Sequence, residues 1–197
     1  MFVLQKVVVL LNRFYDKFIY ANSLKYKHNN FFLVDLPFLI CPAQLLSGLL
    51  ETQDSVFEKK LYLAIKESVA KDLIPAFGTE FGLRGKKMVA FLEQYFVASG
   101  WGTINNVDLD FKAKKAIVRV SNNPVASRLH LKAKAPADHI LRGILAGLFS
   151  RVFEEPVDCV ETHCCALGEG DCEFIIKKQP LFDFSDKRVR QQLEAEI

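Results

Sequence analysis

The sequence lacks a strong excess of charge of either sign, and it lacks any long apolar run. Its 197 residues carry 26 Lys and Arg against 23 Asp and Glu, which gives a formal net charge of +3. This balance is too mild to indicate nucleic acid as a partner, and short basic runs are usually solvated faces. No apolar stretch approaches the roughly 20 residues that a membrane-spanning helix needs. We therefore expect no nucleic-acid partner for this chain alone and no membrane span.

The beginning of the chain also lacks the features of a secretory signal. The segment 1–11 has no basic start, is interrupted by Gln5-Lys6 and has no small-residue cleavage site. We expect a cytoplasmic protein. Clustered cysteines in that reducing compartment are more often metal ligands than disulfides.

Internal repeats, low-complexity tracts and a clear linker are likewise absent, so the length indicates one domain. Half of the residues are hydrophobic, 17 of them Phe, and a quarter are charged. That composition excludes a disordered chain and leaves room either for a large core or for an apolar ligand. We divide the chain into an N-terminal helix at 1–18, a main domain at 19–178 and a tail helix within 179–197.

Apolar residues at helical spacing predict several helices. They span Phe2 to Phe18, Pro42 to about Glu51, Asp54 or Ser55 to Ile74 (before Pro75), Lys86 to Ser99, a segment opened by Pro136, and a tail capped by Ser185 or Asp186 with Val189, Leu193 and Ile197 on one face. The glycine-rich segment 78–85 is expected to be a loop. Gly143 and Gly147, one helical turn apart, are expected to let another backbone approach closely.

Alternating patterns around turn-prone residues predict three hairpins. The strand pairs are 19–27 with 30–35, 103–111 with 116–121, and 157–165 with 171–177. The expected fold is of the α/β (α+β) class, an antiparallel sheet built from hairpins and packed against several helices. An apolar pocket is expected inside it.

Cysteines concentrate in the last of these hairpins. Four of the five lie in the fourteen residues 159–172, together with Glu161 and His163. Cys164 and Cys172 flank a segment with two glycines, so closing the turn brings their sulfurs to the separation that two zinc ligands require. Glu161 stands three positions before Cys164. The strand must therefore bend or end between them if both are to bind one ion.

Three interpretations of this cluster remain open. It is a metal site, a buried and inert cysteine cluster, or a disulfide or redox pair, although the spacing is not Cys-x-x-Cys. His163 and Cys165 flank Cys164 and should point to the opposite face of a strand, which makes them poorer ligands. Asp138 and His139, at the start of the buried helix, are placed to reach the hairpin if that helix packs across it.

The pattern Glu161-x-x-Cys164-x-Ala166-x-Gly168-x-x-x-Cys172-x-Phe174 resembles the 4-vinyl reductase domain family. These are hydrocarbon-binding proteins related to the sensor domains of aromatic-responsive regulators and, more distantly, to TRAPP vesicle-tethering subunits. Gly100-Trp101-Gly102, Asn123-Pro124-Val125-Ala126 and the helix with Gly143 and Gly147 support the resemblance. It covers about Ile19 to Lys178.

The resemblance implies a zinc site and a homodimer that encloses an apolar pocket. In the sensor relatives, zinc is held by a glutamate and two cysteines that match Glu161, Cys164 and Cys172, plus a cysteine at the start of the preceding helix. Asp138 stands at that helix position here, as judged by its spacing to Gly143, and His139 is the substitute if Asp138 points away. Carboxylate oxygen can replace thiolate as a zinc ligand and makes the site harder.

A reductase activity finds no support in the residues themselves. The sequence has no dinucleotide fingerprint, no flavin motif and no convergent acid–base pair, and Trp101 is interpreted as a packing residue. We therefore predict a binding or sensing domain for a small hydrophobic or aromatic molecule with a structural zinc site. The alternatives are a reductase or accessory subunit acting on a vinyl-bearing tetrapyrrole, and an interaction or scaffold subunit.

Overall fold

The computed structural model describes residues 24–33, 36–52 and 54–194. The predicted helix Phe2 to Phe18, the first part of the predicted hairpin and Ile197 of the tail stripe lie outside these ranges. The described helices are α2 (Ala43–Leu50), α3 (Ser55–Ser68), α4 (Ile74–Phe81), α5 (Gly85–Ala98), α6 (His139–Val152) and α7 (Lys187–Leu193). None of them is long and apolar enough to cross a membrane.

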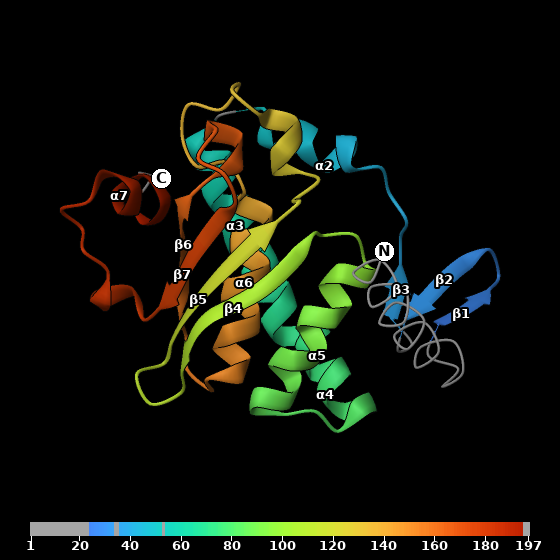
Figure 1. Cartoon of the computed structure of the whole chain (residues 1–197). Helices are drawn as coiled ribbons and strands as arrows, with labels where there is room; N and C mark the ends of the chain where they lie inside the picture. Colours follow the sequence, from blue (N-terminus) through green and yellow to red (C-terminus); the bar gives the residue numbers. More distant parts are fainter. Residues whose placement is uncertain (1–23, 34–35, 53, 195–197) are drawn as a thin grey trace, which may run out of the picture.

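Two antiparallel sheets complete the fold, which confirms the predicted α+β class. The strands are β1 (Leu24–Lys27), β2 (Asn30–Leu33), β3 (Leu36–Phe38), β4 (Thr103–Asp110), β5 (Lys115–Ser121), β6 (Asp158–His163) and β7 (Cys172–Lys177). The small sheet has the order β1-β2-β3 and the main sheet the order β4-β5-β7-β6. Figure 1 shows the small sheet at one side of the molecule, joined to α2 by an extended segment.

Local signals account for the turns and caps. In the β1–β2 hairpin His28 and Asn29 have φ of 51° and 63°, the left-handed conformation that a two-residue turn between twisted strands requires. Asp54 caps α3 by accepting hydrogen bonds from the backbone N–H groups of Val56 and Phe57. Gly100, with φ of 81°, follows the end of α5 as predicted.

The predicted helix end before Pro75 is wrong. After α3 the chain forms a π-helical turn, η1 (Val69–Leu73), and continues directly into α4. Pro75 stands in the first turn of α4, where its missing N–H costs least, and the wider π turn accommodates the interruption. The segment 78–85 is therefore mostly helical rather than a loop. Gly82, with φ of 61°, ends α4 and α5 starts at Gly85.

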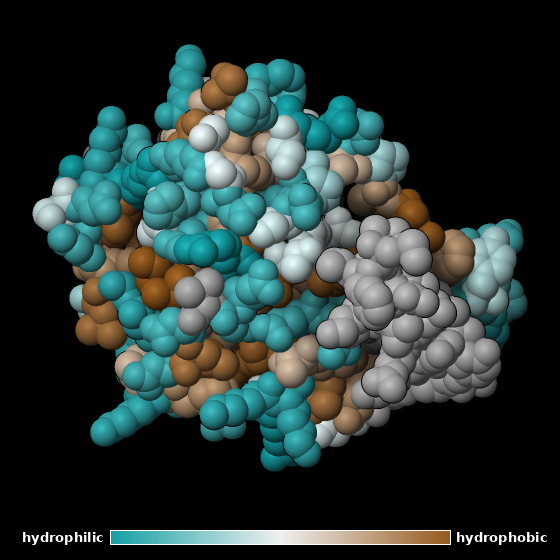
Figure 2. Space-filling model, viewed as in Figure 1, coloured by the Kyte–Doolittle hydropathy of each residue, from teal (hydrophilic) through white to brown (hydrophobic). Residues whose placement is uncertain are grey.

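The helices α3, α5 and α6 lie behind the main sheet in Figure 1, and α7 lies beside β6. Helix α6 is buried along most of its length between α3 and the sheet. It begins three residues later than Pro136, because the Asp138 carboxylate accepts a hydrogen bond from Leu141 N and caps the helix there. The opposite side of β6 packs on α7 through Val160, Val189 and Leu193. Figure 2, in the same view, shows hydrophilic and hydrophobic side chains interspersed over this face.

The predicted close approach at Gly143 and Gly147 is confirmed. A Cβ on Gly147 would lie 2.5 Å from the Lys66 carbonyl oxygen, and one on Gly143 would lie 2.8 Å from that of Tyr62. Both distances are shorter than real Cβ atoms adopt, and the blocking atoms belong to the backbone of α3. The two glycines therefore set the distance between α3 and α6.

Gly147→Ala should lower the free energy of unfolding by about 1–3 kcal/mol, because α3 and α6 must separate to admit the methyl group. Gly48→Ala is the matched control, since a Cβ on Gly48 in α2 meets nothing within 4 Å. It should be neutral or stabilise the protein by up to about 1 kcal/mol. Urea unfolding of both variants measures the difference, and equal effects would contradict the close packing.

Candidate functional site

The site lies where β6 turns into β7, at the start of α6. The pairing of the two strands shifts between Glu161 and His163, so β6 carries a bulge just before its end. The chain then passes through the short 3-10 turn η3 (Cys165–Leu167), and Gly168 adopts φ of 77°. The bulge supplies the bend that the odd spacing from Glu161 to Cys164 requires.

Glu161, Cys164 and Cys172 converge at this turn. One carboxylate oxygen and the two sulfurs all lie within 4.8 Å of one another, and all three residues are fully buried. The spacing argument from the sequence thus brings together the intended side chains. A carboxylate with two thiolates is a donor set that suits zinc better than magnesium or calcium.

The Glu161 carboxyl group is incompletely satisfied. Its Oε2 accepts a hydrogen bond of 3.1 Å from the backbone N–H of Asp138, whereas Oε1 is buried and has no hydrogen-bond partner among the residues that the structure describes. Burial, followed by the negative charge of Cys164, raises the pKa of Glu161 well above its usual value. A buried carboxyl oxygen without a donor is costly, and a cation bound there would complete it.

The two buried cysteines share one proton unequally. The neighbouring Cys172 thiol lowers the pKa of Cys164 to about 6, whereas the neighbouring thiols of Cys164 and Cys165, together with burial, raise the pKa of Cys172. Cys164 is thus the sulfur that carries the negative charge at neutral pH. Its thiolate is the form that binds a metal.

Asp138 lies beside the group of three and is fully buried, with its carboxylate bonded within the protein. Oδ1 accepts from Leu141 N at 2.9 Å, and Oδ2 accepts from the Asn123 side-chain amide at 2.5 Å. Its oxygens are not part of the close group, but an ionised carboxylate keeps further lone pairs beyond two hydrogen bonds. Burial raises the pKa of Asp138.

His139 faces away from the turn. Its Nε2 lies 3.3 Å from a Glu58 carboxylate oxygen on α3, and its Nδ1 lies 2.9 Å from the Arg142 guanidinium. His163 is exposed and lies 3.4 Å from the Glu173 carboxylate. Both imidazoles are therefore engaged with other groups.

Two residues have roles that the sequence argument missed. Asn123 orients Asp138 with its amide, and its Oδ1 accepts from Val125 N and Ala126 N. Its place in the Asn-Pro segment was the only available signal. Cys165 was expected on the opposite face from Cys164, yet its backbone N–H donates to the Cys172 sulfur at 3.3 Å. The face rule fails because the strand has already ended and the chain follows a 3-10 turn.

A second feature lies between α5, α6 and the main sheet. The described side chains leave a space of only about 10 Å³ there, lined by Val89, Leu92, Glu93, Phe96, Ile104, Asn106, Val118, Leu145, Leu148 and Phe149. The expected apolar pocket is thus filled by its own side chains. Two larger hollows, of about 420 and 1380 Å³, have charged residues such as Glu58 and Lys66 in their linings.

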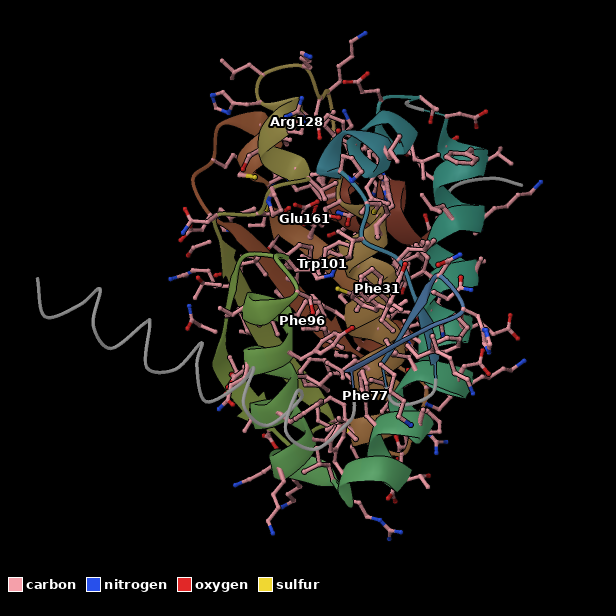
Figure 3. The ribbon with its side chains drawn as sticks, turned by 90° about the vertical axis from the view of Figure 1, so that its right-hand side faces the viewer. Phe31, Phe77, Phe96, Trp101, Arg128 and Glu161 are labelled. Atoms are coloured by element: carbon pink, nitrogen blue, oxygen red, sulfur yellow. The ribbon has the colours of Figure 1, made fainter. Side chains whose placement is uncertain are left out.

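Asn106 is the polar exception in this apolar space. Its side-chain amide and its backbone N–H both donate to the Glu93 carboxylate, the second at 3.3 Å. Its Oδ1 is buried and has no hydrogen-bond partner within the described part of the chain. Figure 3 shows Trp101 and Phe96 between Glu161 and Phe77, and the Trp101 and Phe96 ring centroids are 6.4 Å apart. Trp101 packs on the core, as predicted.

The family comparison concerns the part of the chain that contains the metal-ligand pattern. Residues 116–178 match the 4-vinyl reductase domain. This confirms the resemblance drawn from the sequence, and the matched segment includes α6, β6, β7 and all of the predicted metal ligands. A search of the curated proteins finds no match.

Solved structures extend the likeness beyond the matched segment. The phenol-responsive sensory domain of the transcription activator PoxR, determined with phenol, aligns with a TM-score of 0.69 at 13% identity, over 93% of this chain and 95% of that one. Trafficking protein particle complex subunit 3 from Naegleria fowleri, covalently bound to palmitic acid, aligns at 0.51 and 15% identity, over 68% of this chain and 93% of that one. These likenesses establish the fold.

A vinyl-4-reductase family protein from Methanocaldococcus jannaschii aligns with a TM-score of 0.44 at 16% identity. The alignment covers 71% of this chain and 96% of that chain.

Proposed function

We propose that this protein is a ligand-binding or sensing domain for a small hydrophobic or aromatic molecule and that a structural zinc ion holds its last hairpin to α6. The family match and the fold shared with a phenol-responsive sensory domain support a sensory role. The observation that carries the proposal is the unpartnered Asn106 oxygen in an otherwise largely apolar space. Homodimer formation and a cytoplasmic location, both expected from the sequence, belong to the same proposal.

The metal part of the proposal assigns Glu161, Cys164 and Cys172 as three ligands and Asp138 as the fourth. The unpartnered Glu161 Oε1 supports a cation at this position, and the two sulfurs favour zinc. Four protein ligands would leave no open position for catalysis, so the ion would be structural. It would link β6, β7 and the first residue before α6, segments that are far apart in the sequence.

The ligand part of the proposal places the molecule between α5, α6 and the main sheet. Most of the lining side chains are apolar, whereas Asn106 Oδ1 can accept one more hydrogen bond. A ligand with an aromatic body and one hydroxyl donor matches this combination. Because the space is so small, side chains such as Phe96 and Phe149 must move when the ligand enters.

Phenol should therefore bind more tightly than toluene, a similar ring without the donor. Trp101 is the only tryptophan and lies against Phe96, so its fluorescence reports binding directly. Asn106→Leu should remove the preference for phenol, which we expect to be about tenfold, because a ligand hydroxyl then meets no acceptor.

Asn105→Leu is the matched control, because Asn105 is the neighbouring, exposed position on β4. It should keep the preference of the unmodified protein. The absence of any saturable fluorescence or melting change with phenol, toluene and larger aromatics would contradict the ligand-binding proposal. Equal phenol preference in the Asn106→Leu and Asn105→Leu variants would contradict the role of Asn106.

A further inference from the structure

Three thiol groups meet at the β6–β7 turn, but they differ in their access to solvent. Cys164 and Cys172 are fully buried, whereas Cys165 is half-buried. Cys165 lies on the outer side of the cluster, where its sulfur is 3.9 Å from the Ser127 hydroxyl. An oxidant that arrives from solvent therefore meets Cys165 before either of the buried sulfurs.

The turn places Cys165 against Cys172. The Cys165 backbone N–H donates to the Cys172 sulfur at 3.3 Å, so the two side chains start from adjacent positions. Gly168 and Gly170, with φ of 77° and 87°, form the reversal between them. No large movement of the backbone is needed to bring the Cys165 sulfur to the Cys172 sulfur, which is the geometric requirement for a disulfide.

We propose that Cys165 is an oxidation site for hydroperoxides and that Cys172 is its resolving cysteine. Hydrogen peroxide oxidises the Cys165 thiol to a sulfenic acid and is itself reduced to one water. The Cys172 sulfur then attacks the sulfenic sulfur, the S–O bond breaks, and the hydroxyl leaves as a second water. The sum is two thiols and one peroxide converted to one disulfide and two waters.

This reaction would act on the proposed zinc site without involving the space beside Asn106. A Cys172 sulfur held in a disulfide is no longer a thiolate ligand, so one of the ligands leaves the set. The disulfide step itself rests only on the arrangement of the thiols. The release of metal additionally rests on the proposed zinc site.

The test treats the zinc-loaded full chain with a small excess of hydrogen peroxide. Intact mass spectrometry and thiol alkylation measure disulfide formation, and a chromogenic chelator measures released zinc. The unmodified protein should lose two hydrogen masses and two alkylatable thiols and should release its zinc. Cys165→Ser should retain zinc and release it at least about tenfold more slowly, because the accessible thiol has gone.

Cys41→Ser is the matched control, because Cys41 is exposed and stands far from the turn in the sequence. It should form the disulfide at the unmodified rate. Cys165→Ala repeats the test with a different side chain, and circular dichroism verifies that each variant is folded. Equal peroxide-driven thiol loss in the Cys165 variants and the unmodified protein would overturn the proposal, because Cys164 and Cys172 would then react without Cys165.

The metal-free protein separates this proposal from the proposed function. Disulfide formation without zinc, blocked by Cys165→Ser, would support the oxidation site even if the protein binds neither zinc nor phenol. Zinc and phenol binding with no peroxide-induced disulfide would leave the proposed function intact and refute the oxidation site.

Discussion

Cys172→Ser should leave the purified protein without bound zinc and should lower its melting temperature markedly. A ligand present at a thousand times its dissociation constant contributes about 4 kcal/mol of stability, and this contribution disappears when the site can no longer bind. Cys164→Ser should act in the same way, because its sulfur belongs to the same close group. Elemental analysis and thermal unfolding with and without chelator measure both effects.

Two further variants make this experiment specific. Cys41→Ser should leave zinc content and melting unchanged, since Cys41 is exposed and outside the group. Asp138→Asn keeps a residue that caps helices well, so α6 retains its hydrogen bond to Leu141 N while the proposed fourth ligand loses its charge. It should weaken zinc binding with little loss of stability in the metal-free state. Unchanged zinc content and melting in both cysteine variants would refute the structural zinc.

Arg142→Met should lower the free energy of unfolding by about 3 kcal/mol or more. Arg142 is only 1% exposed, and its guanidinium donates to the carbonyl oxygens of Cys159 and Gln192, each at 3.0 Å. It also lies 4.6 Å from the centre of the Tyr62 ring. Methionine fills much of the volume but leaves the buried acceptors without a donor, and this desolvation penalty is the main cost.

Arg119→Met controls for the removal of an arginine as such. Arg119 lies on β5 with half of its side chain exposed and pairs with Glu173 at 2.9 Å. Its loss should cost less than about 1 kcal/mol, because exposed ion pairs contribute little. Urea denaturation compares the two variants. Similar free-energy changes would show that the Arg142 contacts do not stabilise the fold.

The Arg142 contacts also join α7 to the body of the protein. Gln192 on α7 exchanges two hydrogen bonds with the backbone of Glu161, one accepted from its N–H at 2.8 Å and one donated to its carbonyl at 2.9 Å. Arg188 pairs with Glu169 in the turn. The tail helix is therefore attached at the strand that carries a proposed metal ligand.

Local sequence signals were sufficient for most of the fold because caps and turns depend on a few adjacent residues. Asp54 and Asp186 accept hydrogen bonds from N–H groups two or three positions ahead, and the His28-Asn29 turn sets the β1–β2 register. The same local rule failed at Pro75. There the packing of η1 on α6 keeps the chain helical, and a π turn absorbs what an isolated helix would not.

The sequence by itself determined that a hairpin would close between Cys164 and Cys172 and that Glu161 would join them only at an irregularity of the strand. Both follow from residue spacing and glycine positions. Only the tertiary structure decided that Asp138 sits beside Glu161, that His139 turns to Glu58 and that Cys165 meets Cys172. Those contacts depend on the packing of α6 across the hairpin and on where β6 ends. Neither property has a period or a short motif that the sequence could display.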